Sequence, residues 1–381
     1  MSGWGGILAA VTDTVAARLD RVRGRAAPLR HNARTIAALT GNPGCARRAV
    51  VDAAGVDKTA LAAHVGHPSR YGQSPFAIAR GHAFEARLKA DGYAALRGVI
   101  AAKLPGAAVD GPVEDLGGES GADHAARYAR TRAALADGTA GLVDHPLLRL
   151  TVAGQVVHLE PDLVACRVAG RLHVVEIKSF PILDGRADPP KVAAAATQAA
   201  VYVLALRELL TAAGADPAAV ATDALLVCPR DFGQQPAGAV LDLRRQVAVL
   251  RRQLRRLTRL DALLADLPAG YTLDLGDPAA PRPAGEVAAA LGALPARYAP
   301  DCLAACELAY HCRAEASGST AALGPAVREE LGGVADVRAA LALADGAPAA
   351  PGQEEAAALL RAAARLRADA LAAPAAAGRP A

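Results

Sequence analysis

The chain has few lysines and few aromatic side chains for its length of 381 residues. Aromatic residues make up 3% of it, and lysine is confined to positions 58, 89, 103, 178 and 191. Alanine and arginine are abundant instead, which indicates a GC-rich coding sequence and carries no functional information. Against this background, the presence of a lysine at position 178 is informative.

Several sequence patterns are absent. No G-x-x-x-x-G-K-[ST] loop is present, which excludes a visible helicase motor within the chain, and no G-x-S-x-G elbow is present. Asp144 and His145 make no recognisable ligand set. Asp13 soon interrupts the early apolar segment, unlike a secretory signal, and no apolar run is long enough to span a bilayer. We therefore expect a cytoplasmic protein without membrane contact.

The length suits one large domain with appendages, or two domains. Composition predicts a helical N-terminal lead at 1–40, a central domain at 41–313, and an Ala-rich helical and low-complexity tail at 314–381. The formal net charge of +4 is compatible with a nucleic-acid partner but not specific to one. Segment 244–266 predicts a helix with arginines along one face, which could track a phosphate backbone or be a solvated face.

Residues 158–178 carry the most informative pattern. Pro-Asp at 161–162 precedes one segment rich in Val and Leu, and Glu-Ile-Lys at 176–178 ends a second such segment. Two carboxylates can hold a divalent cation, while a lysine can orient water and offset phosphate charge. The pattern indicates metal-assisted phosphodiester cleavage, and the alternative is an ordinary amphipathic hairpin with solvated charges.

The register of this hairpin decides whether the polar groups converge. A three-residue loop at 168–170 would place Gly170 where φ is positive, and would set Asp162 opposite Glu176. Because side chains alternate along a strand, Glu176 and Lys178 share a face, and all three polar groups then meet. A two-residue loop would shift the register and separate the two acids.

Helices flanking the hairpin add polar side chains. The segment around His82 and Glu85 favours a helix with both residues on one face, where an imidazole could complete a metal shell. Segment 191–211 is strongly helical, with Gln198 and Tyr202 one turn apart, which suggests a polar contact such as one with a nucleic-acid strand. The alternatives are a structural histidine and a core tyrosine beside a solvated glutamine.

Taken in order, these motifs resemble those of the RecB-type PD-(D/E)XK nuclease superfamily. The motifs are Gly81-His82 with Glu85, Pro161-Asp162, Glu176-Ile177-Lys178, and Gln198-x-x-x-Tyr202. The resemblance covers about residues 45–313. It implies an α/β fold with a restriction-endonuclease-like mixed β-sheet core flanked by helices, and Mg or Mn as the cofactor.

The resemblance also implies roles for single residues. The implied metal ligands are the side chains of His82, Asp162 and Glu176 and the backbone carbonyl of Ile177. The implied catalytic residues are Lys178, Asp162 and Glu176, with Glu85 in support, and Gln198 and Tyr202 would contact DNA.

The cysteines give an independent signal. Clustered cysteines in a cytosolic protein are more typical of metal binding than of disulfides. Cys302, Cys306 and Cys312 follow the hairpin region and Cys45 precedes it, and together they can make a four-cysteine site. The other two, Cys166 and Cys228, lie in apolar β-like segments and read as buried hydrophobic residues.

This layout is similar to the iron–sulfur branch of the superfamily, which includes the CRISPR-adaptation exonucleases and the AddB nuclease domain. The similarity implies a 4Fe-4S cluster that clasps the fold. The family usually has a two-residue gap after its first C-terminal cysteine, whereas three residues separate Cys302 from Cys306. Zinc, with His311 as a further ligand, is therefore the alternative occupant.

The sequence therefore predicts a Mg/Mn-dependent deoxyribonuclease, more specifically an exonuclease of DNA repair, recombination or phage defence. Its partner would be DNA, with a helicase or another repair or defence subunit as a compatible further partner. The alternative is a catalytically silent DNA-binding or DNA-end clamp module of the same fold.

Overall fold

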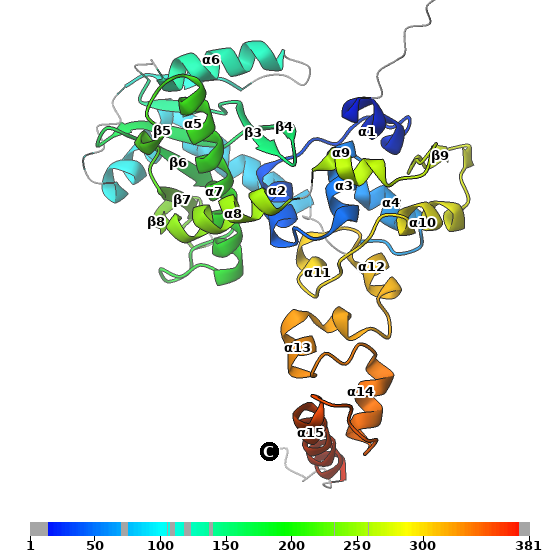
Figure 1. The fold of residues 1–381 in the computed structure, drawn as a ribbon. Helices are drawn as coiled ribbons and strands as arrows, with labels where there is room; N and C mark the ends of the chain where they lie inside the picture. Colours follow the sequence, from blue (N-terminus) through cyan, green and yellow to red (C-terminus); the bar gives the residue numbers. More distant parts are fainter. Residues whose placement is uncertain are drawn as a thin grey trace, which may run out of the picture. The chain divides into compact units, whose positions relative to one another are not determined.

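The computed structural model describes residues 14–69, 75–104, 106, 111–117, 123–136, 140–231, 233–257 and 259–372. The chain divides into two compact units, which are described separately. The first unit comprises Met1–Asp57, Gly72–Arg282 and Ala289–Pro295, and the second Lys58–Tyr71, Pro283–Ala288 and Ala296–Ala381. Figure 1 labels their helices and strands.

The first unit is built on a six-stranded mixed β-sheet with the strand order β1-β2-β5-β6-β7-β8. Its strands are β1 (Val113–Asp115), β2 (Leu142–Asp144), β5 (Leu163–Val168), β6 (Arg171–Ile177), β7 (Asp223–Pro229) and β8 (Pro236–Asp242). Neighbours β1/β2 and β6/β7 are parallel, and the other pairs are antiparallel. The prediction of a mixed α/β fold is confirmed.

Further elements of the first unit surround this sheet. Two short antiparallel pairs are β3 (Leu148–Val152) with β4 (Gln155–Leu159), and β9 (Gly276–Asp277) with β10 (Ala280–Pro281). The helices are α1 (Val15–Arg23), α2 (Ala33–Gly41), α3 (Ala46–Ala54), α5 (Pro75–Lys103), α6 (His124–Ala136), α7 (Pro189–Ala212), η1 (Pro217–Ala219), α8 (Arg244–Arg256) and α9 (Leu260–Ala265). Because α2 packs against α7 and α8, residues 33–41 belong to this unit rather than to a separate lead.

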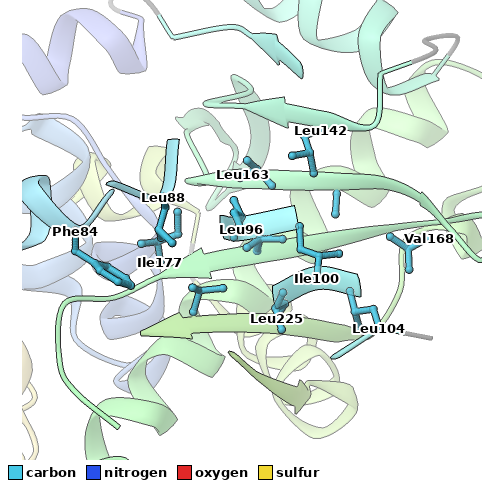
Figure 2. Close-up of a cluster of buried hydrophobic side chains, with 13 residues drawn as sticks. Phe84, Leu88, Leu96, Ile100, Leu104, Leu142, Leu163, Val168, Ile177 and Leu225 are labelled. Carbon is cyan, nitrogen blue, oxygen red and sulfur yellow. The ribbon is translucent and has the colours of Figure 1, made fainter. Parts of the chain in front are cut away.

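Helix α5 covers one face of the sheet. Apolar side chains of α5 pack against alternate residues of β2, β5, β6 and β7, and Figure 2 shows this core. The labelled members are Phe84, Leu88, Leu96, Ile100, Leu104, Leu142, Leu163, Val168, Ile177 and Leu225. Since side chains alternate along a strand, burial of Leu163 and Ile177 on this face directs Asp162 and Glu176 to the other face.

Helix α7 covers that other face, where Ala195 packs with Leu226 and Cys228. It follows β6 and precedes the parallel strand β7, so that β6-α7-β7 is a crossover unit. In length and composition α7 could cross a membrane, which corrects the expectation that no such run exists. Its most apolar window is 61% buried, because the helix packs against the sheet.

Helix α5 is interrupted at residues 90–93. Ala90 is extended, and Asp91, Gly92 and Tyr93 all have positive φ. Such a left-handed backbone is costly for Asp and Tyr, so surrounding contacts have to hold it. The hydroxyl of Tyr93 donates a hydrogen bond of 2.6 Å to Oδ2 of Asp144 at the end of β2, which is one such contact.

The second unit is helical. Its elements are α4 (Lys58–His64), α11 (Cys302–Ala305), α12 (Ala309–Glu315), η2 (Thr320–Leu323), α13 (Pro325–Glu330), α14 (Val337–Ala344) and α15 (Glu354–Ala372), and α10 (Ala284–Gly292) crosses the boundary between the units. The cysteine segment thus groups with the C-terminal helices, whereas the sequence suggested a boundary at 313/314. One cause is α4, since Lys58 Nζ lies 3.4 Å from Glu307 Oε2.

Candidate active site at the end of the β5–β6 hairpin

The β5–β6 hairpin has a two-residue turn rather than the predicted three-residue loop. Val168 pairs with Arg171, and Ala169 and Gly170 lie between them with φ values of 50° and 78°. Positive φ at both central positions is typical of a type I′ turn, whose twist matches that of antiparallel strands. The predicted loop was therefore wrong by one residue.

A β-bulge restores the register that the turn alone would have lost. The pairing is irregular between Ala165 and Val168, and beyond this point Leu163 pairs with Val175. One further step along this ladder sets Asp162 opposite Glu176. The predicted alignment of the two acids is thus confirmed, because an extra residue in β5 compensates for the shorter turn.

Asp162, Glu176 and Lys178, which we call the hairpin site, meet at one end of the sheet. The backbone N–H of Ile177 donates a hydrogen bond of 2.7 Å to Oδ2 of Asp162. Oε1 of Glu176 forms an ion pair with Nζ of Lys178. The convergence of these three side chains agrees with the sequence prediction.

Burial dominates the electrostatics of the hairpin site. It raises the pKa of Glu176 to about 7 and raises that of Asp162, although Lys178 opposes both shifts. Burial alone would lower the pKa of Lys178, but the two carboxylates outweigh it and the net shift is upward. Lys178 is therefore an ammonium ion at neutral pH, and the buried acids favour a cation nearby.

The donor atoms fit a hard divalent cation. Oε2 of Glu176 is buried and has no hydrogen-bond partner among the residues that the structure describes. A buried carboxylate oxygen without a partner is costly. Carboxylate and carbonyl oxygens are the ligands that Mg²⁺ and Mn²⁺ prefer, so Asp162, Glu176 and the carbonyl of Ile177 are a chemically suitable set.

Tyr202 lies beside the hairpin site, but it is buried instead of facing a nucleic-acid strand. Its side chain is 8% exposed, and its hydroxyl donates a hydrogen bond of 3.1 Å to the carbonyl of Glu160. Burial and the neighbouring Glu176 and Asp162 raise its pKa well above the ordinary value. Tyr202 thus supports the segment leading into Asp162, while Gln198, one turn earlier, is partly exposed.

The two α5 residues predicted for the site differ in their surroundings. Glu85 is close enough to Asp162 for its charge to raise the pKa of that carboxyl. His82 is exposed, and its ring nitrogens do not form a compact three-ligand group with Asp162 and Glu176. The neighbouring Gly81 packs close to Ser179, where a Cβ would lie 3.7 Å from the serine side chain. The metal role of His82 stays a prediction.

A second polar cluster lies at the end of β2, on the α5 side. Asp144, 1% exposed, accepts the hydroxyl of Tyr93 and lies 2.9 Å from Nζ of Lys89. Nδ1 of His145 is 3.0 Å from the other oxygen of Asp144. We call Glu85, Lys89, Tyr93, Asp144 and His145 the β2 cluster. Burial opposes ionisation of Asp144, but bonds from His145, Tyr93 and Lys89 prevail and hold its pKa at about 2.

The two clusters adjoin. The backbone N–H of His145 donates to the carbonyl of Asp162 over 3.3 Å. Ligand atoms of Asp144, His145 and Asp115, the last residue of β1, also lie within 4.8 Å of one another. Sequence reasoning missed this set because β1 and β2 have three residues each, too few for a period-2 pattern. The available signal was Asp-His directly after the buried pair Leu142-Val143.

Arg127 of α6 was also missed. Its guanidinium donates to the carbonyls of Leu116 and His145, over 3.1 and 3.3 Å, and forms an ion pair of 3.1 Å with Glu160. It is 6% exposed. One buried arginine thus joins the segments that follow β1 and β2 to the segment that enters Asp162, since a guanidinium offers several donors in a fixed plane.

The predicted cluster cysteines lie in both units. Cys45 precedes α3 in the first unit, whereas Cys302, Cys306 and Cys312 lie on or beside α11 and α12 in the second. All are free cysteines, as are the buried Cys166 and Cys228. His311 Nε2 lies 3.2 Å from Oε1 of Glu315. The shared four-cysteine site stays a prediction from the sequence.

Comparison with known proteins adds no relative: no protein-family model matches the chain, and no curated protein matches it.

Proposed function

We propose that the protein is a metal-dependent deoxyribonuclease that hydrolyses phosphodiester bonds at the hairpin site. The observation that carries the proposal is the arrangement of two buried carboxylates, Asp162 and Glu176, beside the ammonium of Lys178. Its setting at the end of a mixed sheet, between a helix on each face, agrees with the restriction-endonuclease-like core that the motif order suggests.

Each residue has a defined part in the proposed chemistry. Asp162, Glu176 and the carbonyl of Ile177 would hold a Mg²⁺ or Mn²⁺ ion, which would activate water and offset charge on the phosphate. The N–H of Ile177 fixes the orientation of the Asp162 carboxylate. Because Lys178 remains protonated, it would stabilise negative charge that develops on the phosphate, and not accept a proton.

Several exposed arginines of α8 are suited to hold the DNA strand. Arg245, Arg251, Arg252, Arg255 and Arg256 are exposed, while Val247 and Leu250 are buried on the opposite side of the helix. A basic stripe of this kind binds phosphates without reading the base sequence. Since α8 packs against α7, it belongs to the same unit as the hairpin site.

The cysteines extend the proposal to a 4Fe-4S cluster held by Cys45, Cys302, Cys306 and Cys312, with zinc as the alternative occupant. Support comes from their free state and from the proximity in sequence of three of them. DNA is the proposed partner, and an exonuclease of repair, recombination or phage defence is the proposed biological setting.

The decisive test is cleavage of labelled single-stranded, linear double-stranded and circular DNA with Mg²⁺ or Mn²⁺. Asp162→Asn and Lys178→Met should each reduce the cleavage rate by about 100-fold or more. Asp188→Asn and Lys191→Met are matched controls, since this pair lies exposed at the start of α7 with an N–O distance of 3.6 Å. Both controls should cleave like the wild type.

The outcomes separate the alternatives. Equal cleavage by the wild type and both hairpin-site variants would refute the catalytic proposal. DNA binding without any cleavage would favour a silent DNA-end clamp of the same fold. Cleavage of linear but not circular DNA would identify an exonuclease.

A further inference from the structure

Lys89 lies at the centre of the β2 cluster. Its ammonium is 2.7 Å from Oε1 of Glu85, 2.9 Å from Oδ2 of Asp144 and 3.2 Å from Nδ1 of His145. Its side chain is 23% exposed, and that of Asp144 is 2% exposed. One positive charge is thus held by two carboxylates and an imidazole in a largely enclosed place.

These three partners are also the groups that would bind a divalent metal ion. Carboxylates with a histidine suit Mn²⁺ and similar ions, and two-metal nucleases place their ions about 4 Å apart. The β2 cluster adjoins the hairpin site, since the N–H of His145 bonds to the carbonyl of Asp162 and the charge of Glu85 acts on Asp162. A second metal ion would therefore be expected at this position if the position were open.

The backbone keeps Lys89 in place. Glu85 and Lys89 are one turn apart on α5, and the helix is interrupted directly after Lys89. The interruption brings the hydroxyl of Tyr93 to the same oxygen of Asp144 that Lys89 contacts. That oxygen therefore already has two donors, and a metal ion could bind it only after Lys89 had moved away.

We propose that Lys89 is a built-in cation that occupies the place of a second metal ion, so that the protein binds a single divalent ion, at Asp162 and Glu176. This rests on the proposed function for the hairpin ion but not for the β2 cluster. Lys89 also ties Glu85 to Asp144, and it thereby acts as a positioning residue for the acid that α5 contributes beside Asp162.

The test is the number of Mn²⁺ ions bound per chain, measured on the full-length protein by electron paramagnetic resonance and by titration calorimetry. The wild type should bind one ion. Lys89→Met and Lys89→Gln should each bind two, because both open the place between Glu85, Asp144 and His145. Lys89→Arg, which retains a cation, should bind one.

Two controls locate the ions. Lys103→Met, at the other end of α5, should leave the count at one. Adding Asp144→Asn to Lys89→Met should return the count from two to one, and circular dichroism checks that each variant is folded.

The results are decisive in either direction. Two ions in the wild type would overturn the inference, whether or not the variants fold, as would an unchanged count in folded Lys89→Met and Lys89→Gln. If the wild type binds no ion and cleaves no DNA, the proposed function fails at the hairpin site. A gain of one ion in Lys89→Met would still support the role of Lys89 in that case.

Discussion

Glu176 combines full burial with a carboxylate oxygen that has no hydrogen-bond partner among the described residues. Few side chains are placed at such a cost without a function, because an ionised carboxylate away from water needs a nearby positive charge. Lys178 supplies one charge, and the second acid, Asp162, increases the demand. The residue thus explains both why a cation is favoured and why the metal-free protein should depend on pH.

We expect the metal-free protein to lose stability as the pH rises from 4.5 to above 7. The pKa of Glu176 rises from 4.5 to about 7 on folding, because burial favours the neutral acid. Its stabilising contribution is therefore complete below pH 4.5 and is lost as the pH passes 7. The shift corresponds to about 3 kcal/mol.

The measurement is the free energy of unfolding by urea in the presence of a chelator, at pH 5 and pH 8. Glu176→Gln, which cannot ionise, is the control, and the difference between the two proteins isolates this one group. If that difference is the same at both pH values, the electrostatic description of the hairpin site is wrong. In the wild type, Mn²⁺ should bind more tightly at the higher pH, since the metal competes with the proton.

At the scale of single elements, the β5–β6 hairpin shows how a bulge can compensate for a turn. The turn at Ala169-Gly170 is one residue shorter than the alignment of Asp162 with Glu176 requires, and the irregular pairing after Ala165 supplies the missing residue. Bulges are common near functional sites, where they redirect side chains. The sequence contained no sign of this one, because a bulge depends on pairing with the neighbouring strand.

Deleting Arg167 should remove the bulge without disturbing the hairpin site. The two-residue turn and the pairing of Val168 with Arg171 would remain, Cys166 would pair with Leu172, and Leu163 would still pair with Val175. We expect Mn²⁺ affinity and cleavage within about threefold of the wild type. By contrast, an alanine inserted after Arg167 adds a second unpaired residue and should reduce Mn²⁺ affinity by about 10-fold or more. Loss of Mn²⁺ binding in the folded deletion variant would disprove this account of the register.

Helix α8 allows a prediction about DNA binding. Replacing Arg251, Arg252, Arg255 and Arg256 by glutamine should weaken binding, and should reduce the dependence of the binding constant on salt by about 0.9 per lost phosphate contact on duplex DNA. Arg244→Gln is the control, because Arg244 already pairs with Asp242 at the start of the helix. Fluorescence anisotropy at several salt concentrations gives the slope. An unchanged slope in the fourfold variant would show that the stripe is only a solvated face.

At the scale of the whole molecule, the two units have separate cores. The six-stranded sheet forms the first, and Val334, Ala340, Leu343 and Ala357 form a small core among the C-terminal helices of the second. The cysteine segment belongs to the second unit, together with α4. This division could not be predicted, because α4 lies some 240 residues before its ion-pair partner Glu307 in the chain.

Protein purified without air should be brown and contain about four iron atoms per chain if the cysteines hold a 4Fe-4S cluster. Serine at position 45, 302, 306 or 312 should each abolish iron binding. Serine at 166 or 228 should not, since these two thiols are buried within β5 and β7. Iron and zinc contents are measured by elemental analysis. Colourless protein with stoichiometric zinc would replace the iron–sulfur assignment by a zinc site.

The sequence by itself determined the elements whose pattern is local. The helix α7, the strands β5 to β8 and the alignment of Asp162 with Glu176 follow from runs of apolar residues and from alternation along a strand. The tertiary structure decided what depends on distant segments: the pairing of β1 with β2, the bulge, the burial of Tyr202, and the contacts of Lys89 and Arg127. The physical reason is that burial and ion pairing are set by which surfaces meet, and short strands and single charged residues carry no periodic signal of their partners.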